Sequence, residues 1–220
     1  MPRLQTSPTL TEMSLAALNK LNADPDGLYL MIEGRAVDRA EHANNLGRTI
    51  EDYIEFNAAV QSVIDYVNSP GSKATFEDTL LIVTADHDHL PFGPECETIP
   101  FQRVQEDRNG DGVPEYQWFG KGHSNQLVPP FATGAGADQV LNLATRVDSV
   151  FDAAGHSIAG SGRSYTDQAE LRKFLLGQVE QPDAAAPEAP VDWNAIAAQV
   201  TRASCPGPPR GQSRASSAST

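Results

Sequence analysis

The fold of this chain is decided by the stretch Leu28-Tyr-Leu-Met-Ile-Glu33-Gly-Arg-Ala-Val-Asp38-Arg-Ala-Glu-His42. Leu28–Ile32 is a short apolar run without a charge, which predicts a strand covered on both faces and ending at Glu33. Asp38 and His42 follow four residues apart. On a helix this spacing places a carboxylate and an imidazole on one face, where both can bind one divalent cation. The spacing alone is more often typical of a solvated helix face or a local hydrogen bond.

A second stretch repeats this design. Thr79-Leu-Leu-Ile-Val-Thr84-Ala-Asp86-His87-Asp-His89 is a β-branched apolar run that ends in an aspartate and a histidine. In open α/β sheets, ligands bind beyond the carboxyl ends of the strands, so two such strands side by side would direct both polar clusters into one crevice. The alternative is that Asp86 and His87 only cap a loop, and it requires two coincidences.

These motifs, taken in order, resemble the C-terminal half of the alkaline phosphatase family over about residues 7 to 180. The resemblance implies an α/β fold, a three-layer αβα sandwich with a mostly parallel central sheet, of which this chain would be the C-terminal portion. The motifs that carry it are Ile32-Glu33-Gly34 with Asp38 and His42, then Thr84-Ala85-Asp86-His87, then Gly122-His123 ahead of Leu127-Val-Pro.

The same resemblance implies two Zn²⁺ ions and one Mg²⁺ ion. Asp38, His42 and His123 would hold one zinc. Asp86 and His87 would contribute to the second zinc, and Glu33 would bind the magnesium. His89 is expected to lie outside this ligand set, next to the ligands.

The resemblance further implies hydrolysis of small phosphate monoesters through a phosphorylated serine. In the family this serine lies in an Asp-Ser-Ala-type segment of the N-terminal half, and no such segment is found in this chain. Asp148-Ser149-Val150 is rejected as the nucleophile, because it follows the metal motifs and lies in a predicted helix. We therefore expect that this chain is the C-terminal part of a phosphatase, either an expressed fragment or a truncated reading frame. We also expect it to be inactive when assayed alone.

Two other functions remain open. A phosphodiesterase, a sulfatase or a cofactor-independent phosphomutase of the same superfamily would use a related two-metal sheet, although the Glu33 position favours the monoesterase. A non-catalytic metal- or calcium-binding protein is the other alternative. The family also implies a periplasmic or secreted location, whereas the start Met-Pro-Arg-Leu-Gln-Thr-Ser shows no secretion signal. A homodimer is left open.

The amino-acid composition limits the kinds of partner that the chain can bind. The 220 residues include 40% hydrophobic ones, which is typical of a soluble globular protein, and carry a formal net charge of −13. This charge argues against a nucleic-acid surface and against a basic patch for anionic membranes. It does not exclude a phosphate substrate, because several acids are predicted ligands and bound cations would dominate the local field. No apolar run is long enough for a membrane span.

We expect a catalytic-type domain over residues 1–180 and a low-complexity, disordered tail over residues 181–220. About residues 90–120 form a long connection or a small inserted lobe. Helices are predicted at 9–21, where Thr9 and Glu12 fit a capping box, and at 49–67, 138–151 and 166–179. A disulfide between Cys96 and Cys205 is neither supported nor excluded.

Within the lobe, Asp107-Arg-Asn109-Gly-Asp111-Gly-Val-Pro-Glu115 places oxygen ligands at the first, third, fifth and ninth positions around a glycine. Calcium-binding loops use the same positions. Trp118 occupies the twelfth position, where such loops carry a bidentate acid. Calcium at the 107–115 loop and a plain polar turn therefore both remain open.

Overall fold

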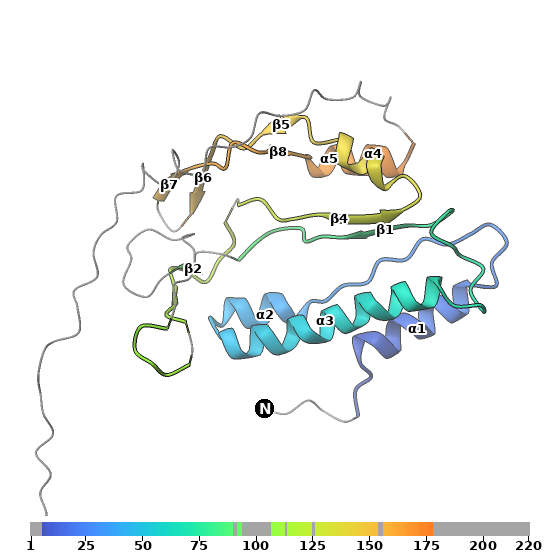
Figure 1. Ribbon diagram of the computed structural model, residues 1–220, viewed down its shortest axis with the longest axis horizontal. Coiled ribbons are helices and arrows are strands. Elements are labelled where there is room, and N and C mark those ends of the chain that lie inside the picture. The colour runs from blue at the N-terminus through green and yellow to red at the C-terminus, as the bar shows by residue number, and fades with distance from the viewer. Residues whose placement is uncertain are drawn as a thin grey trace, which may run out of the picture.

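The structure is a computed structural model and describes residues 6–89, 92–93, 107–112, 114–124, 126–153 and 156–177. Figure 1 shows three tiers: helices α1, α2 and α3 on one side, a β1–β4 ribbon in the middle, and α4 and α5 on the other side. The elements are α1 (Leu10–Leu21), α2 (Ala36–His42), α3 (Leu46–Val67), β1 (Leu80–Val83), β2 (Phe92–Gly93), β3 (Gln117–Trp118), β4 (Phe131–Gly134), α4 (Ala137–Asn142), β5 (Arg146–Val147), β6 (Val150–Ala153), β7 (His156–Ala159), β8 (Ser164–Tyr165) and α5 (Gln168–Leu175).

Helix α1 begins as the sequence predicts. The Glu12 amide donates to Thr9 Oγ1 at 2.9 Å, and the Thr9 amide donates to Glu12 Oε2 at 2.6 Å. These two bonds form the capping box, which satisfies amides that the first helical turn leaves without partners. Leu18 anchors the helix in the core, where it is buried.

Helix α3 begins at Leu46, ahead of the predicted start, because the Asn45 side chain caps it by accepting from the Arg48 amide at 3.0 Å. Its buried side leaves out two large apolar residues. Ile50 and Ile54 are 52% and 64% exposed. Both isoleucines are thus left largely exposed, although α1 and α2 pack against α3. The buried residues of α3 are Thr49, Asp52, Ala59, Val63 and Val67.

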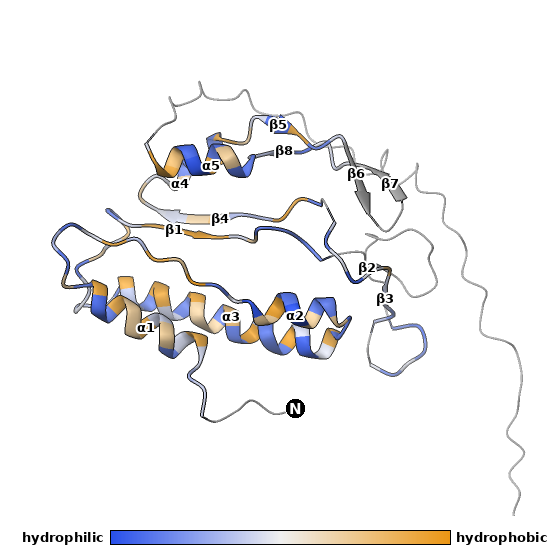
Figure 2. Ribbon diagram, turned by 180° about the vertical axis from the view of Figure 1, so that it is seen from behind, coloured by the Kyte–Doolittle hydropathy of each residue, from blue (hydrophilic) through white to orange (hydrophobic). Residues whose placement is uncertain are grey.

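The central ribbon is antiparallel. Leu80 of β1 lies opposite Gly134 of β4, and Val83 lies opposite Phe131. All strand pairs in the described part of the chain are antiparallel, so the predicted mostly parallel sheet is not confirmed, although helices on both sides of strands give an α/β arrangement. Between α3 and the ribbon lies an apolar cavity of about 260 Å³. In Figure 2 the ribbon of β1 has the colour of hydrophobic residues, and α3 carries both hydrophobic and hydrophilic residues.

The prediction of a strand at Leu28–Ile32 is wrong. This segment belongs to no strand and has no ladder partner among the described residues. Tyr29 is 82% exposed and Met31 is 75% exposed, so the segment is not covered on both faces. An apolar run becomes a strand only when a neighbour accepts its backbone hydrogen bonds, and the described partner of β1 is β4.

The C-terminal third contains less helix than predicted. The expected helix over 138–151 ends at Asn142 in α4, and β5 follows it and pairs with β8. Helix α5 matches the expected helix, with the Asp167 side chain accepting from the Ala169 amide at 2.8 Å. None of the helices in the described ranges combines the length and apolar character needed to cross a bilayer. The predicted tail, Cys96 and Cys205 lie outside the described residues.

Candidate metal centre

Four of the five histidines in the chain gather around one aspartate. Asp38 and His42 come from adjacent turns of α2, as the four-residue spacing predicts. The other three histidines come from two connections: residues 84–89 follow β1, and residues 119–124 precede β4. These three histidines are His87, His89 and His123.

The Asp38 carboxylate is the centre of the cluster. His89 Nε2 donates to Asp38 Oδ1 at 2.7 Å. The Nε2 atoms of His42, His123 and His87 lie 3.6, 3.7 and 3.9 Å from the same oxygen. One ligand atom each from Asp38, His42, His89 and His123 lie within 4.8 Å of one another. A single cation can be reached from all four side chains.

A backbone contact fixes the orientation of His42. Its Nδ1 donates to the carbonyl oxygen of Lys121 at 2.6 Å, which leaves the Nε2 lone pair facing the cluster. Metal-binding histidines usually donate their second ring nitrogen to a carbonyl or carboxylate in this way. His42 therefore has the arrangement of a metal ligand.

The imidazole rings are packed against one another. The rings of His87 and His123 are stacked, with centroids 3.4 Å apart and an interplanar angle of 16°. The rings of His42 and His89 meet edge to face at 4.1 Å and 81°. Rings from three separate segments therefore meet in one compact cluster.

The ionisation of this cluster follows from burial and from the Asp38 charge. Burial lowers the pKa of His89, and the hydrogen bond to Asp38 opposes that effect only in part. Burial alone would raise the pKa of Asp38, but the hydrogen bond from His89 and the nearby histidines hold it below its ordinary value. Burial, followed by the charges of Asp38 and Asp88, raises the pKa of Glu41 to about 7. This concentration of carboxylates favours a bound cation.

The family resemblance implies that Asp38, His42 and His123 hold one zinc, and the structure brings these three side chains together. His87 lies beside this group, with its Nε2 atom 3.9 Å from Asp38 Oδ1. The Asp86 side chain is 85% exposed, and its Oδ2 atom lies 3.6 Å from His87 Nε2. Glu33 is exposed, and among the described residues no hydrogen bond or ion pair joins it to the cluster.

Several contacts of the centre could not be found from sequence motifs. His89, expected beside the ligands, is 3% exposed and is a full member of the four-residue group. The Ser124 hydroxyl donates to Asp88 Oδ2, and Gln168 of α5 donates to the Asp86 carbonyl at 2.6 Å. These residues come together from distant parts of the chain, and no spacing rule predicts them.

Of the rejected Asp148-Ser149 pair, the aspartate has a structural role. Asp148 Oδ2 accepts from the amide of Ser161 at 2.7 Å and from its hydroxyl at 2.8 Å. Ser149 is exposed between β5 and β6, rather than in a helix as predicted. Neither residue belongs to the metal cluster.

The 107–115 loop closes on the carboxylate of Asp107. Oδ1 of Asp107 accepts from the Gly110 amide at 2.6 Å, and Oδ2 accepts from the Gly112 amide at 2.7 Å. These backbone hydrogen bonds lower the pKa of Asp107, and the bond from the Gly112 amide has the largest effect. Glu115 Oε1 accepts from the Arg108 amide at 2.7 Å. A polar turn accounts for these bonds, and calcium in the loop remains a prediction.

Comparison with known proteins assigns the chain to a family. The profile of the alkaline phosphatase family matches residues 2–148. Alkaline phosphatase H of Pseudomonas aeruginosa (strain UCBPP-PA14) is 29% identical over 150 residues, which cover 66% of this chain and 30% of the relative. The human tissue-nonspecific isozyme of alkaline phosphatase is 33% identical over 85 residues, covering 39% of this chain and 15% of the relative.

Among solved structures, alkaline phosphatase from the Antarctic bacterium TAB5 is similar with a TM-score of 0.46 and 24% identity, covering 61% of this chain and 36% of that one. The chain spans less than a third of the length of the two curated relatives. The family profile matches well over half of the chain, including the residues of α2, β1 and the centre from Asp38 to His123. This chain belongs to the alkaline phosphatase family.

Proposed function

We propose that this chain supplies metal ligands to a hydrolase of small phosphate monoesters. The observation that carries the proposal is the convergence of Asp38, His42, His89 and His123 within 4.8 Å. These side chains come from three separate segments, and family membership supports a phosphatase-type role for them. The proposed location, periplasmic or secreted, and the homodimer have only the family as their support.

The donor chemistry fits zinc. Imidazole nitrogens with a carboxylate oxygen are a usual Zn²⁺ ligand set, and a harder all-oxygen site suits Mg²⁺. Under this proposal Asp38, His42 and His123 hold one zinc, Asp86 and His87 contribute to a second zinc, and Glu33 binds magnesium. The Asp86 side chain is 85% exposed and Glu33 is exposed, so this assignment requires both side chains to turn toward the centre.

When bound, such cations stabilise the charge that develops on phosphate oxygens during in-line displacement. The chain's own contribution is to hold its imidazoles in one tautomer and one place. The Lys121 carbonyl does so for His42, and Asp38 does so for His89. The phosphorylated serine of the proposed reaction is not supplied by this chain.

The test is metal analysis of the purified chain after equilibration with Zn²⁺ and Mg²⁺. We expect bound zinc that falls by at least one equivalent in Asp38→Ala and is unchanged in the matched control Asp65→Ala, an exposed aspartate on α3. No zinc in the wild-type chain, or equal zinc in both variants, would contradict the proposal. The chain alone should not hydrolyse an aryl phosphate, and hydrolysis that Asp86→Ala abolishes would show the catalytic serine to be unnecessary.

The alternatives give different results in the same experiment. A phosphodiesterase or sulfatase of the superfamily would also bind zinc, but a chain extended with an Asp-Ser-Ala-type segment of the family would prefer diesters or sulfate esters. A non-catalytic calcium-binding protein would bind calcium alone, at the 107–115 loop. One observation favours testing this loop: the Oε2 atom of Glu115 is buried and has no hydrogen-bond partner among the described residues.

Calcium binding to the loop can be measured by calorimetric titration of the zinc-free chain. The expected result under the calcium hypothesis is one equivalent that Asp107→Ala removes and that Asp24→Ala, an exposed aspartate outside the loop, leaves unchanged. Titration without heat would leave the polar turn as the explanation of the motif.

A further inference from the structure

The connection that carries His123 is tied to the connection that carries His87 and His89. The Ser124 hydroxyl donates to Oδ2 of Asp88 at 2.5 Å, although the two residues are 36 positions apart. Ser124 directly follows His123, and Asp88 lies between the other two histidines. One hydrogen bond thus joins both segments next to the rings that meet in the cluster.

The Ser124 hydroxyl has a second role. It accepts from the Gln126 amide at 3.2 Å, so it both closes the turn after His123 and reaches across to Asp88. The other end of the same connection is held by the bond from His42 to the Lys121 carbonyl. The connection around His123 is therefore anchored on both sides, to α2 and to residues 86–89.

The Asp88 side chain is buried near other acidic residues. Asp88 is only 7% exposed, and its charge contributes to the raised pKa of Glu41. Burying a carboxylate near other acids costs stability unless it gains strong partners. A hydrogen bond to an ionised acceptor is stronger and better directed than one between neutral groups, and it fixes the donor in one place.

We propose that Asp88 and Ser124 are positioning residues that hold His123 in the metal centre. The bond keeps the His123 ring stacked on His87 at 3.4 Å and its Nε2 atom 3.7 Å from Asp38. A ligand that is already in place need not be ordered when the cation binds, so the cation binds more tightly. The expected effect on cation affinity rests on the proposed function. The hydrogen bond that joins the two segments does not depend on that function.

The first measurement is the affinity for Zn²⁺, by competition with a chromophoric zinc chelator. We expect Ser124→Ala to weaken zinc binding about ten-fold, the lower end of the effect of removing groups that orient ligands. Ser124→Thr keeps the hydroxyl and should restore the affinity to near that of the wild type. The matched control is Ser149→Ala, which removes an exposed serine outside the cluster and should change nothing.

The second measurement needs no metal. Lys121 is exposed, and cleavage by trypsin after it requires the connection to open. In the presence of a chelator, Ser124→Ala should be cleaved several-fold faster at Lys121 than the wild type. Asp88→Asn, which keeps an acceptor oxygen but loses the charge, should be intermediate and serves as a second variant. Circular dichroism confirms that the compared proteins are folded.

The outcomes separate the two proposals. Unchanged cleavage at Lys121 in both variants overturns the positioning role, whether or not the chain binds zinc. Faster cleavage with no zinc bound by the wild type supports the tie and contradicts the proposed function. Weaker zinc binding in Ser124→Ala that Ser124→Thr does not restore also overturns the inference, because the hydroxyl would then not be the group that matters.

Discussion

His89 donates from Nε2 to Oδ1 of Asp38 at 2.7 Å, linking the segment after β1 to the middle of α2. His89 is 3% exposed, and its Nδ1 is buried with no hydrogen-bond partner among the described residues. A neutral imidazole that donates from Nε2 has its free lone pair on Nδ1. The structure therefore keeps an unsatisfied acceptor in the interior in order to place a donor against Asp38.

Replacing His89 should weaken cation binding at the centre. In His89→Ala the Asp38 carboxylate loses the donor that fixes its orientation, and we expect zinc affinity to fall by about 10- to 100-fold. His89→Gln retains an N–H donor and should lose less. Chelator competition measures the difference, and equal affinity of all three proteins would contradict an orienting role for His89.

The glycine between Glu33 and α2 should tolerate no side chain. A Cβ atom built on Gly34 would lie 2.5 Å from Cδ2 of Phe56, a ring on α3 that packs beneath this turn. Gly34→Ala must displace either α2 or the Phe56 ring, at a cost of about 1–3 kcal/mol in the free energy of unfolding.

Urea denaturation measures this cost, and Gly122→Ala is its matched control. A Cβ atom at Gly122 meets no atom within 4 Å, so this variant should be close to neutral. A neutral result would show that the position before His123 does not require a residue without a side chain. Equal destabilisation of both variants would contradict the predicted contact at Gly34.

Local spacing predicted some of this centre, and only tertiary contacts could supply the rest. The four-residue interval of Asp38 and His42 places both side chains on one face of any helix. Both residues lie on α2, so this prediction is confirmed. The same reasoning failed for the apolar interval over 138–151, because β5 pairs with β8 from a later segment. Periodicity describes a residue's own element, whereas strand pairing depends on distant residues.

The strand predicted at Leu28–Ile32 failed for the same reason. Its composition suits a buried strand, but in the described residues β1 pairs with β4 and offers this run no partner. His89 was expected next to the ligands, but no spacing rule predicted its bond to Asp38 or the bond of Ser124 to Asp88, because these partners lie far apart in the sequence. The motifs predicted that polar residues of separate segments would meet at one place. The structure brings Asp38, His42 and His123 together, although not at the ends of two parallel strands in the described residues.

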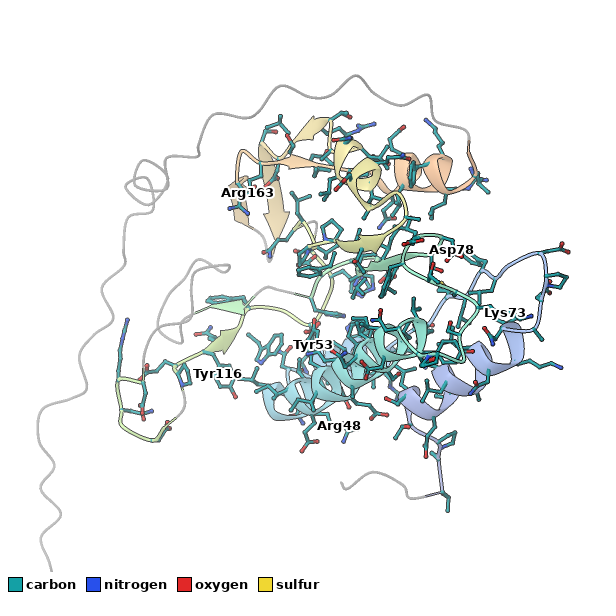
Figure 3. The ribbon with its side chains drawn as sticks, turned by 45° about the vertical axis from the view of Figure 1, so that its right-hand side comes forward. Arg48, Tyr53, Lys73, Asp78, Tyr116 and Arg163 are labelled. Atoms are coloured by element: carbon teal, nitrogen blue, oxygen red, sulfur yellow. The ribbon has the colours of Figure 1, made fainter. Side chains whose placement is uncertain are left out.

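The turn before β1 should be sensitive to acid. Asp78 Oδ1 accepts from the Thr75 amide at 2.7 Å and from the hydroxyls of Thr75 and Thr79, both at 3.1 Å, and Figure 3 labels Asp78 at this turn. The bond from the Thr75 amide is the main reason that the pKa of Asp78 is lowered. The folded state therefore binds a proton less readily than the unfolded chain does.

The sign of the pH effect follows from this lowered pKa. The stability that Asp78 contributes is present above the ordinary aspartate pKa of about 3.9 and is lost as the pH falls through the lower folded value. Wild type should therefore exceed Asp78→Asn in stability at neutral pH, and the difference should shrink toward pH 3. Thermal melts over this range provide the measurement, and a difference that is constant with pH would contradict the role of the charge.

The ion pair on α3 should be worth more than its surface counterpart on α5. Arg48 Nη2 lies 3.0 Å from Asp52 Oδ1, and the Asp52 side chain is 4% exposed; Figure 3 shows Arg48 on the outer side of the helix. Arg48→Met leaves a buried carboxylate with its charged partner removed, which should cost about 1–3 kcal/mol. The exposed pair of Lys173 and Glu170, at 2.8 Å, gives the control variant Lys173→Met, with an expected cost of at most about 1 kcal/mol.

A double variant distinguishes the burial of charge from the loss of packing. Adding Asp52→Leu to Arg48→Met removes the stranded carboxylate and should recover most of the stability, because an apolar side chain suits a buried position that a lone charge does not. Urea denaturation of the two single variants and the double variant completes the cycle. If the double variant is less stable than Arg48→Met, the Asp52 side chain stabilises this position even without Arg48, and the stranded carboxylate is not the cause of the loss.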